Sequence, residues 1–153
     1  MFLGVVLTSV VECTIESWSG VDHHVDAVLL FNVLGHVECT DQRAFFHKLT
    51  TQYLSDKGVI VTCVQFHPML KVLDLPVVDY DDLMKEMSTE GFRVALVKDF
   101  EVYKDLSNPS EEIVRMFQKV TGRSALEVRS AIEVTFAQPE ARVVRNKLTI
   151  FAK

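Results

Sequence analysis

Two continuous apolar runs constrain the fold of this 153-residue chain more than any other feature. The first is Val28–Phe31, within the stretch Asp26–Val37, and the second is Val59–Val64, directly after Gly58. Polar residues do not alternate with the apolar ones in either run, which is typical of parallel strands covered on both faces. The sequence therefore predicts two inner strands of a layered sheet, one at Asp26–Asn32 and one at Val59–Val64.

Helical patterns occupy the segments after these strands. Thr40 can cap a helix in which large apolar residues recur from Phe45 to Leu54, and the stretch 55–58 reads as a turn that ends this helix. Gly91 and Gly122 predict the ends of two later helices. Three helices in this part of the chain are preceded by a capping residue, namely Asp79, Ser110 and Ser124, the last with a capping box to Glu127.

Two further strands, Phe92–Tyr103 and Val143–Phe151, complete the order of elements. Between the earlier elements, the segment Phe66–Asp79 contains two prolines and is predicted to be the longest irregular loop. Strands that alternate with helices predict an α/β sheet with helices on both faces. The length suits a single domain over residues 1–153 with one core.

Charge and cysteine content limit the possible partners. The net charge is −5 and no basic run is present, which argues against nucleic acid and anionic membranes. Three cysteines without paired spacing predict reduced thiols in a cytoplasmic protein. The apolar opening Met1–Val11 is too short to span a bilayer and lacks the features of a signal peptide. It is expected to form a buried strand or to be the end of a segment cut from something longer.

The stretch Asp26–Val37, the helix Phe45–Leu54 and the run Asp56–Val64 together resemble the C-terminal half of a class I S-adenosylmethionine-dependent methyltransferase. The likeness is greatest to the histamine N-methyltransferase group and runs from about Asp26 to the C-terminus. Three segments carry this closer likeness, namely Asp79–Leu83, Gly91-Phe92 and Arg145–Ile150. The resemblance implies a partial Rossmann-like sheet, a C-terminal antiparallel strand pair, S-adenosylmethionine as cofactor and a small amine as substrate.

The resemblance also implies site residues. Asn32 and Asn146 fall where the group has amides that bind the substrate, and Phe31 falls where a residue lines the adenosyl part of the cofactor. Ligands of open α/β sheets bind beyond the carboxyl ends of the strands, where Asn32 is expected. An amide carbonyl can orient an amine nucleophile without adding charge. Two alternatives stay open, a turn-forming role for Asn32 before Gly35 and a surface position for Asn146.

No catalytic residue and no metal ligand set is predicted. His23, His24, His36 and Cys39 lack a recognised ligand spacing, so they are interpreted as loop residues. His67 lies near the predicted ligand-binding edge and could accept a proton, the alternative being an exposed loop histidine.

The N-terminal half of such a fold, with its glycine-rich cofactor loop, is not evident. The chain has six glycines and no G-x-G pair, so the loop that approaches the cofactor is missing from this sequence. Without the neighbouring strand, the Asp26–Asn32 strand would expose an apolar edge. Either Met1–Val11 folds over this edge or another copy of the chain pairs with it, and self-association is predicted, including exchange of elements between chains. Two hypotheses follow. One is a small-amine methyltransferase or its substrate-side half, and the other is a non-catalytic remnant that acts as a self-associating module. Binding of S-adenosylmethionine would distinguish them.

Overall fold

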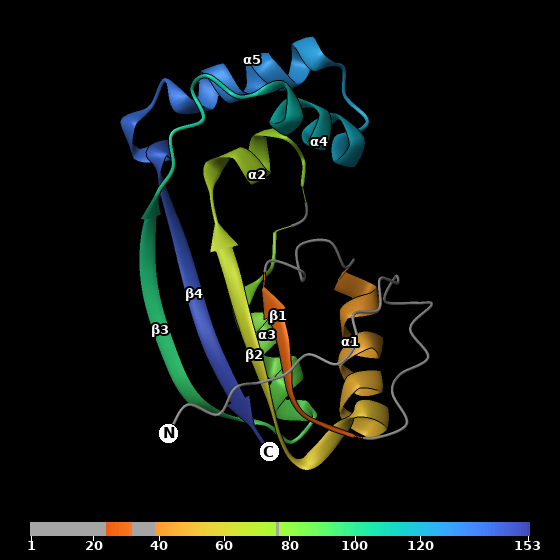
Figure 1. Cartoon of the computed structure of the whole chain (residues 1–153). Helices are drawn as coiled ribbons and strands as arrows, with labels where there is room; N and C mark the ends of the chain where they lie inside the picture. Colours follow the sequence, from red (N-terminus) through yellow and green to blue (C-terminus); the bar gives the residue numbers. More distant parts are fainter. Residues whose placement is uncertain (1–23, 32–38, 76) are drawn as a thin grey trace, which may run out of the picture.

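A computed structural model describes residues 24–31, 39–75 and 77–153, and its sheet confirms the predicted fold class. The strands run in the order β1-β2-β4-β3 (Figure 1). Strand β1 is parallel to β2, and β4 is antiparallel to both of its neighbours. The strand bounds are β1 (Val25–Phe31), β2 (Leu54–Phe66), β3 (Arg93–Tyr103) and β4 (Val143–Ala152). That residues 1–153 form a single domain stays a prediction, because it includes residues outside the described ranges.

Two helices pack on one face of the sheet. Helix α1 (Cys39–Lys48) continues through a π-helical turn (Leu49–Tyr53), and α3 (Tyr80–Thr89) lies beside it (Figure 1). Apolar burial between these helices and the strands forms the first core, because it removes the inward side chains from water. The buried residues of this core include Leu30, Phe46, Leu49, Ile60, Val64, Leu83, Met87 and Phe151.

A helical cap lies beyond the carboxyl end of β2 (Figure 1). It has its own core, formed by Met69, Leu73, Val114, Val128, Ala131, Ile132 and Phe136. The sheet and the cap therefore each bury a separate apolar cluster. The cap consists of α2 (Pro68–Val72), α4 (Glu111–Thr121), α5 (Ala125–Phe136) and the 3₁₀ turn η3 (Pro139–Arg142).

Three of the predicted helix caps are confirmed, whereas the predicted cap Thr40 lies within α1, which begins at Cys39. Ser124 accepts a hydrogen bond from the Glu127 backbone, and the Glu127 carboxylate accepts one from the Ser124 backbone, which completes the capping box. Hydrogen bonds from Ser124 hold the pKa of Glu127 below its usual range. Asp79 and Ser110 cap α3 and α4, and Gly122 ends α4 at a positive φ of 69°.

Two local predictions are wrong. The segment Phe66–Asp79 contains the helix α2, because the side chain of His67 accepts a hydrogen bond from the Met69 backbone and serves as its N-cap. The predicted turn at 55–58 belongs to β2, which pairs with β1 through a register shift rather than starting at Val59. A Cβ at Gly58 would lie 2.4 Å from Leu54 Cγ, so the glycine allows this close approach within the strand.

The described residues cover only one face of the first predicted strand. Leu30 is 6% exposed in the first core, whereas its neighbours Leu29 and Phe31 are 61% and 53% exposed. The reason is that α1 and α3 cover only one face of the sheet. Within the described residues, β1 lies at the edge of the sheet, as expected for a strand without its outer neighbour.

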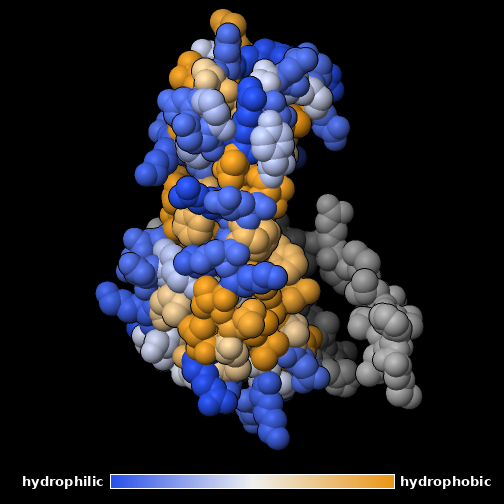
Figure 2. Space-filling model, turned by 90° about the vertical axis from the view of Figure 1, so that its left-hand side faces the viewer, coloured by the Kyte–Doolittle hydropathy of each residue, from blue (hydrophilic) through white to orange (hydrophobic). Residues whose placement is uncertain are grey.

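The pairing registers divide the strand residues between a covered face and an open face. The covered face, against α1 and α3, carries Leu30, Ile60, Thr62, Val64, Thr149 and Phe151. The open face carries Leu29, Phe31, Val61, Cys63, Leu96, Phe100, Asn146, Leu148 and Ile150. Figure 2 shows apolar side chains gathered over the sheet on the side of the molecule where β3 lies. The sheet thus carries apolar side chains on both faces, and α1 and α3 cover one of these faces.

Candidate functional site

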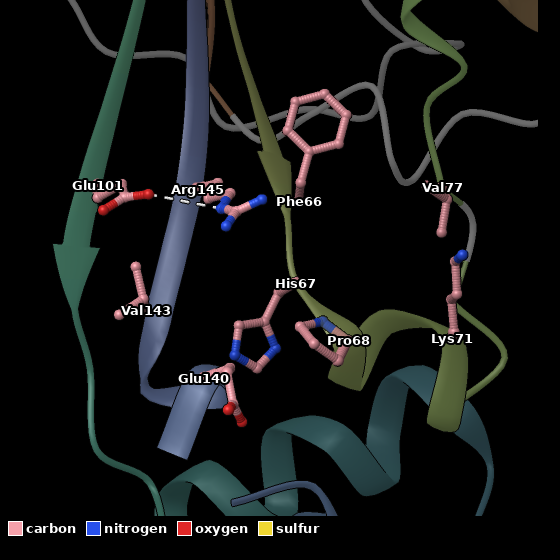
Figure 3. A pocket seen from close by; sticks show the side chains of 9 residues that line it. All are labelled: Phe66, His67, Pro68, Lys71, Val77, Glu101, Glu140, Val143 and Arg145. Carbon is pink, nitrogen blue, oxygen red and sulfur yellow. Dashed lines mark ion pairs between the residues drawn. The ribbon is translucent and has the colours of Figure 1, made fainter. Parts of the chain in front are cut away.

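The candidate site is a cavity of about 680 Å³ at the carboxyl end of β2. This is the edge at which open α/β sheets bind their ligands. The side chains that line it come from five elements and from the segments joining them (Figure 3). They are Phe66, His67, Pro68, Lys71, Val77, Glu101, Glu140, Val143 and Arg145.

The cavity combines apolar walls with both signs of charge. Arg145 Nε lies 3.5 Å from Glu101 Oε1, an ion pair between paired positions of β4 and β3 (Figure 3). Both side chains of this pair are largely exposed, so the pair contributes little stability and is available to a ligand. Lys71 and Glu140 add one further charge of each sign. Such a cavity can hold a small molecule with an apolar body and a charged group.

His67 is neither an exposed loop residue nor an available base. Its Nδ1 accepts a hydrogen bond from the Met69 backbone at 3.1 Å, and its Nε2 donates one to the Ala141 carbonyl at 2.6 Å. These two partners assign the proton to Nε2. The half-buried ring also stacks on Phe136, with 5.5 Å between the ring centroids. His67 therefore joins the sheet to the cap.

Of the residues predicted from the resemblance, Phe31 and Asn146 do not line this cavity. Asn146 is 8% exposed, and its Nδ2 donates to the Val144 carbonyl at 3.1 Å. It is therefore not the surface amide of the alternative interpretation. Phe31 ends β1 on the same open face, with β2 between the two residues. Asn32 lies outside the described residues, so its predicted role is not located.

The described residues do not form a cradle for S-adenosylmethionine. A glycine-rich loop allows the backbone to come close to a ligand, and a Cβ would obstruct that approach. Gly91 and Gly122 end helices and face open space, and Gly58 is crowded by the side chain of Leu54. Phe31, the predicted adenosyl contact, is more than half exposed. No cofactor contact is therefore assigned to the described part of the chain.

The described residues contain neither a metal-binding cluster nor a membrane-spanning helix. In residues 24–31, 39–75 and 77–153, no group of three or more His, Cys, Asp or Glu side chains is arranged to hold a metal ion. Among the described helices, none has the length and apolar character required to cross a membrane.

The charged residues of the cavity were missed by sequence reasoning. Glu101 and Arg145 are far apart in the chain and meet only because β3 and β4 pair antiparallel. The sequence did contain a signal. One strand carries acidic residues at Asp99 and Glu101, and the other carries basic residues at Arg145 and Lys147, and Asp99 indeed lies 3.3 Å from Lys147. Alternating opposite charges on two strands indicate which residues face each other.

Comparisons with known proteins identify the fold. No family model matches the chain, and no curated protein matches it. Among solved structures, a Bacillus halodurans protein assigned as a methyltransferase superposes with a TM-score of 0.60 at 12% identity, covering 93% of this chain and 70% of that one. A mycolic acid cyclopropane synthase complexed with SAH and CTAB gives 0.55 at 13% identity, covering 91% and 58%.

Coclaurine N-methyltransferase bound to N-methylheliamine and SAH gives a TM-score of 0.54 at 11% identity, covering 92% of this chain and 51% of that one. This chain therefore spans between about half and 70% of the lengths of these three proteins. The structure is similar to class I S-adenosylmethionine-dependent methyltransferases and corresponds to part of their fold.

Proposed function

We propose that this chain, whose fold is a partial methyltransferase fold, is the substrate-side half of an S-adenosylmethionine-dependent N-methyltransferase. In this proposal it holds a small, histamine-like amine in the cavity at the carboxyl end of β2. The observation that carries the proposal is the pair of carboxylates, Glu101 and Glu140, that line this cavity together with apolar walls. An ammonium group is attracted to carboxylates, and an apolar body is accommodated by the walls.

The cavity residues would act by binding and orientation. Glu101 would exchange its exposed ion pair with Arg145 for the ammonium group of the amine. Phe66 and Val143 would exclude water from the bound molecule. Because the described residues form no cofactor cradle, the proposal assigns to them the amine alone and no step of methyl transfer.

Calorimetric titration with histamine tests the amine site. We expect binding that weakens about tenfold in an E101Q/E140Q double variant, because each substitution removes an attracting charge. An E133Q variant serves as the control, since Glu133 is exposed on α5 and does not line the cavity. Equal binding of histamine to the double variant would contradict the proposal.

A thermal shift experiment with SAH tests whether this chain binds the cofactor in addition to the amine. A ligand at about one hundred times its dissociation constant adds roughly 2.7 kcal/mol to the free energy of unfolding. We expect no such shift for this chain. A clear shift would mean that the chain itself holds the cofactor, and the assignment to a substrate-side half would be wrong.

A second candidate function is a non-catalytic, self-associating module. The observation that favours it is the exposed pair Leu29 and Phe31 on edge strand β1, because an apolar edge strand is prone to pair with another chain. Sedimentation at micromolar concentration tests it, with F31D expected to shift the population toward monomer. V134D is the matched control, since Val134 is an exposed apolar residue of the cap at 62%. A wild-type chain that is strictly monomeric would exclude this function.

A further inference from the structure

A second cavity, of about 320 Å³, lies between the sheet and the cap. His67 borders both cavities, and the side chains of β2 and β4 that line this one are Gln65 and Val144. In the alternation of each strand these residues belong to the open face, whereas Phe66 and Arg145 of the first cavity belong to the covered face. Glu101 and Glu140 do not line the second cavity, so it is a separate site.

The walls of this cavity are apolar. Apart from Gln65, His67 and Lys104, every described residue that lines it is hydrophobic. Helix α4 contributes Met116 and Val120, which are 52% and 48% exposed although Val114 on the same helix is fully buried. The apolar surface of α4 thus extends beyond the core of the cap into a space that protein atoms do not fill.

Among the described residues that line the cavity, Lys104 supplies the one cationic side chain. Its backbone N–H donates to the Arg142 carbonyl at 2.8 Å, which fixes the start of its side chain. The neighbouring Asp105 is directed elsewhere, since it accepts a hydrogen bond from Ser107 at 2.9 Å and lies 3.6 Å from Arg142 Nε. Both ring nitrogens of His67 are already hydrogen-bonded. The polar groups left for a ligand are the Lys104 ammonium and the Gln65 amide.

We propose that this cavity binds a medium-chain or aromatic carboxylic acid. The apolar part lies against Met116, Val120 and Phe136, and the carboxylate meets Lys104 with a hydrogen bond from Gln65. The volume is about twice the roughly 150 Å³ of an engineered apolar cavity that binds benzene, so a chain of moderate length is accommodated. Methionine in the wall suits ligands of varied shape, because its side chain is flexible.

Titration calorimetry of the whole chain with octanoate, octanol and octylamine tests the proposal. We expect octanoate to bind about tenfold more tightly than octylamine, because only the carboxylate is attracted by Lys104. A K104M variant should lose that preference while octanol binding is unchanged. K119M is the control, since Lys119 is exposed on α4 and does not line the cavity.

Filling the cavity tests its location. V120W should reduce octanoate binding about tenfold or more, since the indole occupies the space of the ligand. Val120 is half exposed, so folding should tolerate the change, and M116W provides an independent second variant if it does not. The proposal is overturned if octylamine binds as tightly as octanoate, or if folded V120W and M116W bind octanoate like the wild type. All of these titrations use an E101Q/E140Q background, in which the first cavity has lost the carboxylates that attract amines, so octylamine bound there does not affect the comparison.

Discussion

On the covered face of the sheet Phe151 is 1% exposed, whereas on the open face Phe31 is 53% exposed. Both are phenylalanines on strands of the same sheet. The difference comes from the helices, because α1 and α3 cover one face only. A continuous apolar run therefore indicates that both faces of a strand require cover, and it does not indicate where that cover comes from.

The largest expected effect is the difference in stability between alanine variants of these two phenylalanines. F151A should lower the free energy of unfolding by about 3–5 kcal/mol, because it leaves a cavity in the first core. F31A should lower it by about 1 kcal/mol or less, since the side chain is already half in water. Urea unfolding at low protein concentration measures both. If the two variants were equally destabilised, the open face would be covered in solution and the comparison would fail.

A substitution at Gly58 tests the close packing of this residue against the side chain of Leu54. In G58A the new Cβ would meet the buried side chain of Leu54, so a loss of about 1–3 kcal/mol is expected from overpacking. In an L54A background the same G58A change should cost less than it does in the wild type, because the side-chain atoms that the new Cβ would meet are gone. Thermal unfolding of the three variants provides the measurement, and simple additivity of the two losses would argue against the contact.

Two paired threonines sharpen the comparison within the covered face. Thr62 and Thr149 are both fully buried and lie opposite each other in β2 and β4. The Thr62 hydroxyl has no hydrogen-bond partner in the described structure, whereas the Thr149 hydroxyl is 2.7 Å from that of Tyr80. T62V should therefore be neutral or stabilising by about 1 kcal/mol, and T149V should be destabilising by a similar amount. Reversal of this order in denaturant unfolding would refute the assignment of partners.

The smallest expected effect is on the reactivity of Cys63, a residue of the open face. Partial burial raises the pKa of its thiol, so less of the reactive thiolate is present at a given pH. In a variant with Cys13 and Cys39 changed to serine, iodoacetamide should react with Cys63 more slowly than with free cysteine at pH 8. The pH midpoint of the rate should also lie higher. A rate equal to that of free cysteine would mean that Cys63 is not shielded.

Much of the fold was predictable because its signals are local. The caps Asp79, Ser110 and Ser124 and the positive-φ glycines are set by residues within one helical turn, so the sequence locates them. Helix α2 was missed because it has five residues and histidine is an unusual cap. The start of β2 was missed because Ser55–Gly58 has the composition of a turn, although pairing with β1 holds it extended.

The candidate site was less predictable than the fold. The resemblance directed attention to Asn146, which the structure places on the open face, opposite the side of β4 that carries Arg145. The cavity near Arg145 depends on the pairing of β3 with β4 and on the position of α2, and both are long-range features. Glu101 and Lys71, read singly, look like ordinary surface charges. Only their convergence at the end of β2 makes them candidates for binding.

The position of β4 between β2 and β3 sets the order in which the sheet can assemble. Within the described structure β3 pairs only with β4, so β3 has no partner until residues 143–152 have left the ribosome. During that interval α4 and α5 can form from local contacts, while β3 stays an apolar strand without a neighbour. The nascent chain is therefore most exposed to aggregation, and most dependent on chaperones, just before β4 is synthesised.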